Sequence, residues 1–141
     1  MPNVYQAISR GFDVLLGHVR EDGKVYRSRI GPDEYLGRVD LVTGKIYEAR
    51  LGPDKVIGHV DLQSGKVYTV RFGPDKYVGT VDGHGRMHQH ESLAPDDYIG
   101  KLDRFLSFAH SAGAMLLLVL PALKPESENI KPDPGLNNVA D

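Results

Sequence analysis

A chain of 141 residues can form one domain with a modest core, or a smaller domain with an accessory element. Its 17 basic and 19 acidic residues are interspersed, so the broad positive surface of a nucleic-acid-binding protein is absent, and we expect no nucleic-acid partner. The absence of cysteine excludes disulfides, thiolate nucleophiles and cysteine metal sites. The first residues, MPNVYQAISRGF, do not read as a secretory signal, so we expect whatever precedes Phe105 to fold in the cytoplasm.

The chain up to about Asp103 is built from copies of one unit of about 21 residues. Half a unit, NVYQAI, comes first, and a divergent copy, RGFDVLLGHVREDGKVYRSRI, follows it. Three close copies come next: GPDEYLGRVDLVTGKIYEARL (31–51), GPDKVIGHVDLQSGKVYTVRF (52–72) and GPDKYVGTVDGHGRMHQHESL (73–93). Another half unit, APDDYIGKLD, ends the array. A repeat of this length is typical of a propeller, a solenoid or a meandering barrel.

Each unit contains two runs of about five or six β-branched and aromatic residues, such as YLGRVD and KIYEARL, which predict two strands. Turns such as DLVTGK separate the two runs, and Gly-Pro-Asp separates successive units. Every connection is short enough for a hairpin, so we predict an all-β domain at residues 1–104, an antiparallel meander of about ten short strands. The half unit at each end predicts that the first strand pairs with the last and closes a shallow barrel.

Alternation along the strands predicts which side chains are buried. In the second strand of each unit, the row that contains Tyr26, Tyr47 and Tyr68 is the more apolar, and we expect it to face the inside. A tyrosine-lined ligand channel is the alternative to a tyrosine-filled core. The predicted inner row of the first strands contains a glycine in every unit: Gly17, Gly37, Gly58, Gly79 and Gly100. Because glycine weakens a strand, its recurrence indicates sharp curvature or a neighbouring ring lying across the gap.

The pattern Y-x-G-x-V-D-x-x-x-G-K-V-Y, which recurs between Val4 and about Asp103, resembles the four-fold β-flower domain of bacterial proteins. That resemblance implies a shallow, symmetric antiparallel barrel like the Tubby C-terminal fold, which an apolar helix fills. It implies no established activity, and some members of the family look membrane-attached. A weaker similarity, carried by LGRVDLVTGKI, is to PRC-barrel domains, which lack so regular a repeat.

The segment at residues 105–123, FLSFAHSAGAMLLLVLPAL, carries no charged side chain and predicts a helix that either crosses a membrane or fills the barrel. Such a helix measures about 28 Å, close to a hydrocarbon thickness of roughly 30 Å, whereas short strands give a barrel wall of only about 17 to 20 Å. A barrel lined with tyrosine also leaves little room for a helix about 10 Å wide. We therefore favour a single transmembrane helix, and Lys101 and Arg104 before it place the β domain on the cytoplasmic side.

Three residues of this segment are candidates for packing or binding. Ala109 and Gly113 form a small-x-x-x-small pair, which predicts packing against a helix of another membrane protein. His110 is ionisable within the predicted span, so it is a candidate ligand of a haem or of a chlorophyll-type magnesium, or a hydrogen-bond partner of a quinone. The alternative is that His110 simply reaches the lipid headgroups.

The fourth unit departs from the others at HGRMHQH. His88 takes the place of the tyrosine, and His90 follows it on the face that we expect to be inside. Two histidines at i and i+2 of a strand can converge on a metal ion, with Asp82 and His84 in the preceding turn. The alternative is a drifted repeat whose imidazoles stack as the tyrosine rings do.

Residues 124–141, KPESENIKPDPGLNNVAD, form a polar, Pro-rich tail that has little to bury and that we expect to be disordered unless a partner holds it. No phosphate loop, nucleophile elbow or zinc-protease motif occurs in the chain, so we expect no enzymatic activity and no resident cofactor. The sequence predicts a membrane-anchored accessory subunit that docks to a larger membrane protein complex. The alternatives are a soluble or peripheral barrel that binds an apolar ligand or lipid, with the C-terminal helix as a plug, and a cofactor-ligating subunit of an electron-transfer or photosynthetic complex.

Overall fold

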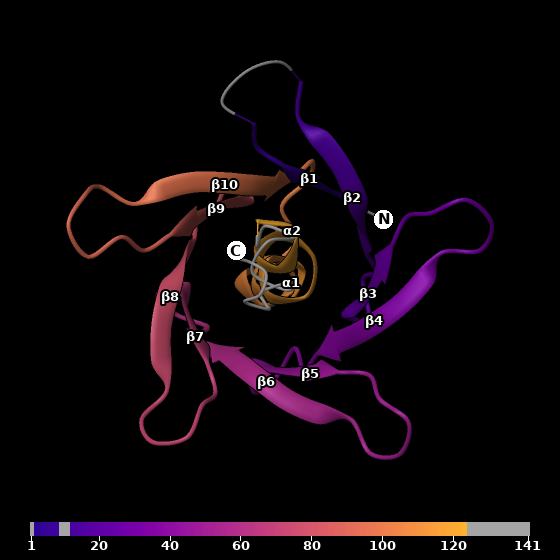
Figure 1. Cartoon of the computed structure of the whole chain (residues 1–141), viewed down its shortest axis with the longest axis horizontal. Helices are drawn as coiled ribbons and strands as arrows, with labels where there is room; N and C mark the ends of the chain where they lie inside the picture. The colour runs from indigo at the N-terminus through magenta and orange to yellow at the C-terminus, as the bar shows by residue number, and fades with distance from the viewer. Residues whose placement is uncertain (1, 9–11, 124–141) are drawn as a thin grey trace, which may run out of the picture.

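The computed structural model describes residues 2–8 and 12–123, which form a closed barrel of ten antiparallel strands around a central helix (Figure 1). The predicted meander and its closure are therefore confirmed. Strands of four and six residues alternate along the chain: β1 (Asn3–Gln6), β2 (Val14–Val19), β3 (Lys24–Arg27), β4 (Glu34–Val39), β5 (Lys45–Glu48), β6 (Lys55–Val60), β7 (Lys66–Thr69), β8 (Lys76–Val81), β9 (Arg86–Gln89) and β10 (Asp97–Leu102).

The two half units close the barrel, as their sequences predict. β1 pairs with β10, so that Val4 lies opposite Leu102. Just outside this pairing, the backbone N–H of Asn3 donates to the carboxylate of Asp103 at 3.0 Å, and the N–H of Asp103 donates to the carbonyl of Asn3 at 3.0 Å. Because every described strand has a neighbour on both sides, the sheet presents no free edge to another chain.

Short turns join the strands at one end of the barrel, which we call the turn end: residues 20–23, 40–44, 61–65 and 82–85. In the second of these turns the carboxylate of Asp40 accepts the backbone N–H groups of Val42 at 2.8 Å and Thr43 at 3.1 Å. Gly44 then takes a φ of +81°, which other residues adopt only with strain. Aspartate and glycine therefore recur in the turns because one caps the turn and the other completes it.

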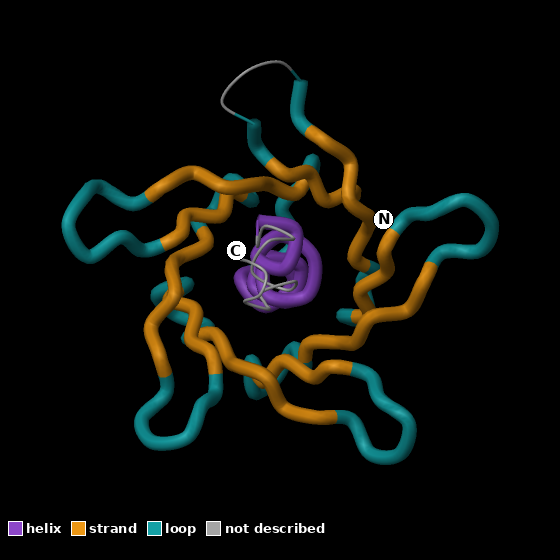
Figure 2. The backbone as a smooth tube through the Cα atoms, viewed as in Figure 1, coloured by secondary structure: helices purple, strands orange, loops and turns teal. Residues whose placement is uncertain are grey.

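Longer loops join the strands at the opposite end and radiate away from the barrel axis (Figure 2). We call this the petal end, and the loops petals 1 to 5. Petals 2 to 5 are residues 28–33, 49–54, 70–75 and 90–96, and petal 1 lies between β1 and β2, where the structure describes residues 7–8 and 12–13. In petals 2 to 4 the glycine of Gly-Pro-Asp has a φ between +85° and +90°. A left-handed residue followed by proline fixes the shape of each loop.

One extra residue bulges from each six-residue strand. In β4, for example, Tyr35 lies opposite Tyr26 and Gly37 lies opposite Val25, so Leu36 between them has no partner on β3. A Cβ atom on Gly37 would overlap the carbonyl oxygen of Tyr47 on the other neighbouring strand. The recurring glycines thus allow the backbones of neighbouring strands to approach closely beside the bulges, a reason that differs from the curvature or covering ring that we predict.

The tyrosine rows face outward, and the prediction that they fill the barrel is wrong. Val25 is fully buried on the inner face, whereas the ring of Tyr26 stacks on His18 outside, with the ring centroids 5.1 Å apart. Because each bulge shifts the alternation by one residue, Tyr35 also faces outward and lies 5.4 Å from Tyr26. Valine, isoleucine, methionine and glycine line the wall instead: the fully buried members of the four-residue strands are Val4, Val25, Ile46, Val67 and Met87.

The apolar C-terminal segment threads the barrel as a helix (Figures 1 and 2). It comprises α1 (Phe108–Ala114), the π-helical turn η1 (Met115–Val119) and α2 (Leu120–Leu123). Every residue from Ala109 to Val119 is buried, and α1 lies against β2, β4, β6 and β8 while η1 lies against β1 and β10. In the part of the chain that the structure describes, no helix is both long enough and apolar enough to cross a bilayer.

The predicted transmembrane helix is thus corrected to a plug, and the reason lies in the width of the barrel. The argument against a plug assumed tyrosine rings inside, which would leave no space for a helix. With the rings outside and small side chains inside, the interior accepts the helix, and the barrel wall rather than lipid buries its leucines. Residues 124–141, for which we predict a partner-bound tail, lie outside the described residues.

The wide turn η1 precedes Pro121. The N–H of Leu120 donates to the carbonyl of Met115, five residues earlier, instead of to the residue four earlier. Proline has no N–H, and its ring presses on the preceding turn of a regular helix. A π-helical turn directly before Pro121 widens the helix where the proline would otherwise interrupt it.

Candidate functional site

The N-terminus of the central helix is fastened to the turn end of the barrel by a buried histidine. Nε2 of His110 lies 2.8 Å from the carbonyl oxygen of Glu21, in the turn between β2 and β3. Because a carbonyl can only accept, Nε2 carries the proton and donates it, and Nδ1 accepts the hydroxyl proton of Ser107 at 2.6 Å in the neutral ring. The hydroxyl oxygen of Ser107 in turn accepts the N–H of His110 and caps the helix.

This arrangement gives His110 a positioning role. Both ring nitrogens are engaged by groups of the same chain, so neither is free to ligate a metal or bond a quinone while the helix is seated. Sequence reasoning selected His110 because it is a polar residue in an apolar segment. The physical reason for its presence is that it satisfies the carbonyl of a turn 89 residues away.

Ala109 and Gly113 pack against the barrel wall. Ala109 is 1% exposed, and a Cβ atom on Gly113 would lie 3.1 Å from Cγ1 of Val39. The small residues therefore bring the helix close to the strands of its own chain, in the way that we predict for packing against a second helix.

His88 lies on the outer wall and His90 at the start of petal 5, so neither lies on the inner face that we predict. Nε2 of His88 is 3.4 Å from a carboxylate oxygen of Asp82, whereas Nδ1 of His90 is 3.3 Å from a carboxylate oxygen of Asp96 in petal 5. The two rings thus turn to different carboxylates. Among residues 2–8 and 12–123 there is no group of three or more side chains placed to hold a metal ion, and the metal site stays a prediction.

Aromatic ladders run across the outer wall, on the face opposite to the one on which we expect the tyrosines. His59 stacks on Tyr68 at 4.8 Å, Tyr68 lies 5.7 Å from Tyr77, and Tyr77 lies 4.8 Å from His90. Burial in this ladder raises the pKa of Tyr77, with the nearby Asp96 carboxylate acting in the same direction. Sequence reasoning missed the ladders because it placed the tyrosines on the wrong face.

The aspartate of each petal lies close to a histidine or basic side chain, which belongs to the wall in four of the five petals. His18 lies 3.4 Å from Asp33, and Arg38 lies 3.5 Å from Asp54. Three further pairs join His59 to Asp75 at 3.3 Å, His90 to Asp96 at 3.3 Å and Lys101 to Asp13 at 3.5 Å. These contacts engage one aspartate of each petal, and Glu91 of petal 5 is not among the acids that they hold.

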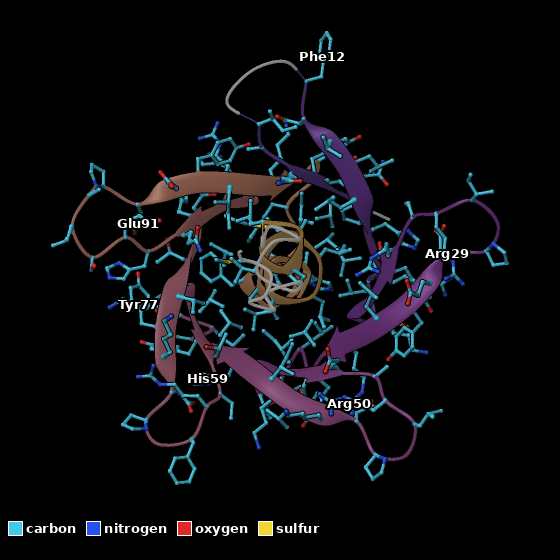
Figure 3. All side chains as sticks on the ribbon, viewed as in Figure 1. Phe12, Arg29, Arg50, His59, Tyr77 and Glu91 are labelled. Atoms are coloured by element: carbon cyan, nitrogen blue, oxygen red, sulfur yellow. The ribbon has the colours of Figure 1, made fainter. Side chains whose placement is uncertain are left out.

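A large apolar side chain stands fully exposed in every petal, and this is the strongest candidate for a functional surface. The exposed fractions are 94% for Phe12, 102% for Ile30, 104% for Leu51, 106% for Phe72 and 98% for Leu93. Figure 3 shows Phe12 at the end of petal 1, pointing away from the barrel axis. We call these five residues the petal tips.

The petal tips occupy related positions in the repeat. Ile30, Leu51 and Phe72 each precede Gly-Pro-Asp, Leu93 precedes Ala-Pro-Asp, and Phe12 directly precedes the aspartate of petal 1. A cavity of about 560 Å³ opens at the same end of the barrel, between the wall and α2, lined by Ile57, Val78, Leu116, Leu120, Pro121 and Leu123 among others. The signal was visible in the sequence as an apolar residue before each turn, but strand alternation assigned it to the core.

Comparison of the chain with models of known protein families, with curated proteins and with solved structures found no match in any of the three. What the protein does is therefore argued from its own geometry.

Proposed function

We propose that the protein is a non-enzymatic accessory protein that docks through its petal tips onto a larger assembly at a membrane. The observation that carries this proposal is the full exposure of a large apolar side chain in all five petals. Single exposed apolar residues are common on soluble proteins, but the same exposure of a large apolar residue in every petal indicates a surface that a partner covers.

A purely binding role fits the interior of the barrel. The central helix fills the space in which other barrels hold a ligand, and the side chains of Ser107 and His110 are engaged with each other and with the backbone. The petals extend from a barrel whose strands close on themselves, so the exposed residues are presented from a rigid support.

We also propose that the chain is a member of the four-fold β-flower family. The sequence motif between Val4 and about Asp103 supports this, as does a closed antiparallel barrel with a helix at its centre. Membership predicts a shared shape and leaves the partner to be found by experiment.

A second candidate function rests on the cavity beside α2. Its lining combines apolar side chains such as Ile57, Val78 and Leu120 with Glu48 and Lys76, which together suit a lipid that has an apolar chain and a polar group. In this alternative the protein is a peripheral lipid-binding barrel with the helix as a plug. A role for His110 in holding a cofactor would require the helix to leave its seat, and it stays a prediction.

Fractionation of the cells that produce the protein tests the proposed function. The wild-type chain is expected to sediment with the membranes, and a variant with Ile30, Leu51, Phe72 and Leu93 changed to serine is expected to remain in the supernatant. Val42→Ser is the matched control, because Val42 is 83% exposed but lies in a turn at the other end of the barrel. Equal sedimentation of the wild-type and four-serine proteins would overturn the proposal.

A further inference from the structure

The petal tips share size and polarity but not shape. The five side chains are two phenylalanines, two leucines and one isoleucine, and those of petals 2 to 4 each precede a glycine of the same left-handed conformation. A protein partner would need several separate pockets, each matched to the side chain that enters it. A lipid bilayer has no pockets and accepts any apolar side chain, so variation in shape at constant hydrophobicity favours a bilayer.

The charged side chains of the petals also favour a bilayer. An arginine directly precedes three of the tips, Ile30, Leu51 and Phe72. Nε of Arg29 donates to the carbonyl of Pro32 at 2.9 Å, and Nε of Arg71 donates to that of Pro74 at 2.9 Å, so these guanidinium groups are held on the petals themselves. Four petal aspartates are instead paired with groups of the wall, Asp96 is paired with His90 of its own petal, and Glu91 is an acidic group two residues before Leu93.

An apolar side chain next to a basic one is the pattern of segments that lie in the membrane interface. The apolar side chain enters the acyl region, and the guanidinium group remains at the depth of the lipid phosphates. Arg50 belongs to the same set. Two of the three arginines also have a carboxylate nearby, because Nη2 of Arg50 lies 2.8 Å from Glu48 and Nη1 of Arg29 lies 3.8 Å from Glu34. Petal 5 has Ser92 at this position and contributes its leucine alone.

We infer that the petal tips insert directly into the lipid bilayer, with the petal arginines bound to anionic headgroups. This inference rests on the proposed function and names lipid as the surface that the petals contact. A tip that enters keeps the neighbouring petals close to the surface, because all the petals extend from the same closed barrel. The protein attaches in this way while its apolar helix remains inside the barrel.

Flotation of the purified full-length protein with vesicles tests the inference. Wild-type protein is expected to float with vesicles of phosphatidylcholine and phosphatidylserine, and more weakly with phosphatidylcholine alone. Each tip changed to serine is expected to weaken binding by about tenfold or more. Val42→Ser is expected to bind as the wild type does, and circular dichroism would show that every variant is folded.

Tryptophan fluorescence locates the contact independently, because the chain contains no tryptophan. Phe72→Trp is expected to give a blue-shifted emission when vesicles are added, and Val42→Trp no shift. Failure of the folded wild-type protein to float with either kind of vesicle would overturn the inference. If native membranes still bound the protein through its tips in that case, the proposed function would stand with a protein as the partner. Loss of both kinds of binding would overturn both proposals.

Discussion

The side chain of Leu116 occupies the space that a side chain on Gly58 would need. A Cβ atom on Gly58 would lie 2.5 Å from Cδ1 of Leu116, and one on Gly79 would lie 2.8 Å from Cε of Met115. The glycine of the strand thus has two structural roles. It allows the bulge to approach the neighbouring strand, and it makes a depression in the inner wall that receives a side chain of the central helix.

Substitution of Gly58 by alanine tests the seating of the helix. The added methyl group meets the carbonyl oxygen of Tyr68 as well as Leu116, so we expect the free energy of unfolding to fall by about 3 kcal/mol, measured by urea denaturation. Gly83→Ala is the matched control, because nothing lies within 4 Å of a Cβ atom there. Its effect is expected to stay within about 0.5 kcal/mol. Equal stability of the two variants would contradict the seated helix.

Two serines of the central helix predict opposite results. Ser107 caps α1 and bonds to His110, so Ser107→Ala is expected to lower the free energy of unfolding by about 1 to 2 kcal/mol. The hydroxyl of Ser111 is buried without a hydrogen-bond partner among the described residues. Ser111→Ala removes an unsatisfied polar group and is expected to leave stability unchanged or to raise it. Thermal denaturation of the pair checks this, and a larger loss for Ser111→Ala would refute the assignment.

Acid sensitivity is expected from the aspartates of the turns. Hydrogen bonds from the backbone N–H groups of Gln63 and Ser64 lower the pKa of Asp61, and bonds from Thr43 and Val42 do the same for Asp40. A pKa lowered by folding contributes stability that is present above the unfolded value of about 4 and is lost as pH falls through the folded value. The denaturation midpoint is therefore expected to fall with pH in that window, and less steeply in Asp61→Asn.

The control for this experiment is Gln63→Ala, which keeps the backbone donor to Asp61 and is expected to retain the wild-type slope. If Asp61→Asn lost stability as steeply as the wild type between pH 5 and the acid transition, the hydrogen bonds of this turn would not be the cause.

The tyrosines show why the buried face was predicted wrongly. Ile30 lies four residues after Tyr26, so strict alternation places both side chains on the same face, which we assign to the core. The strand ends at Arg27, however, so Ile30 belongs to a petal and says nothing about the face of Tyr26. In the next strand the bulge at Leu36 reverses the alternation. Neither the end of the strand nor the bulge leaves a mark in the sequence, so a search for alternating apolar residues does not detect them.

Sequence by itself determined the number of strands, their antiparallel order and the pairing of the first strand with the last, because short turns leave a chain of repeats no other local arrangement. The apolar residue directly before each Gly-Pro-Asp is also visible in the sequence. Only the tertiary structure decided which face of the sheet is inside and what surrounds the segment from Phe108 to Leu123. An apolar helix is stabilised wherever water is excluded, in lipid or in a protein core, and the width of the barrel selects between them.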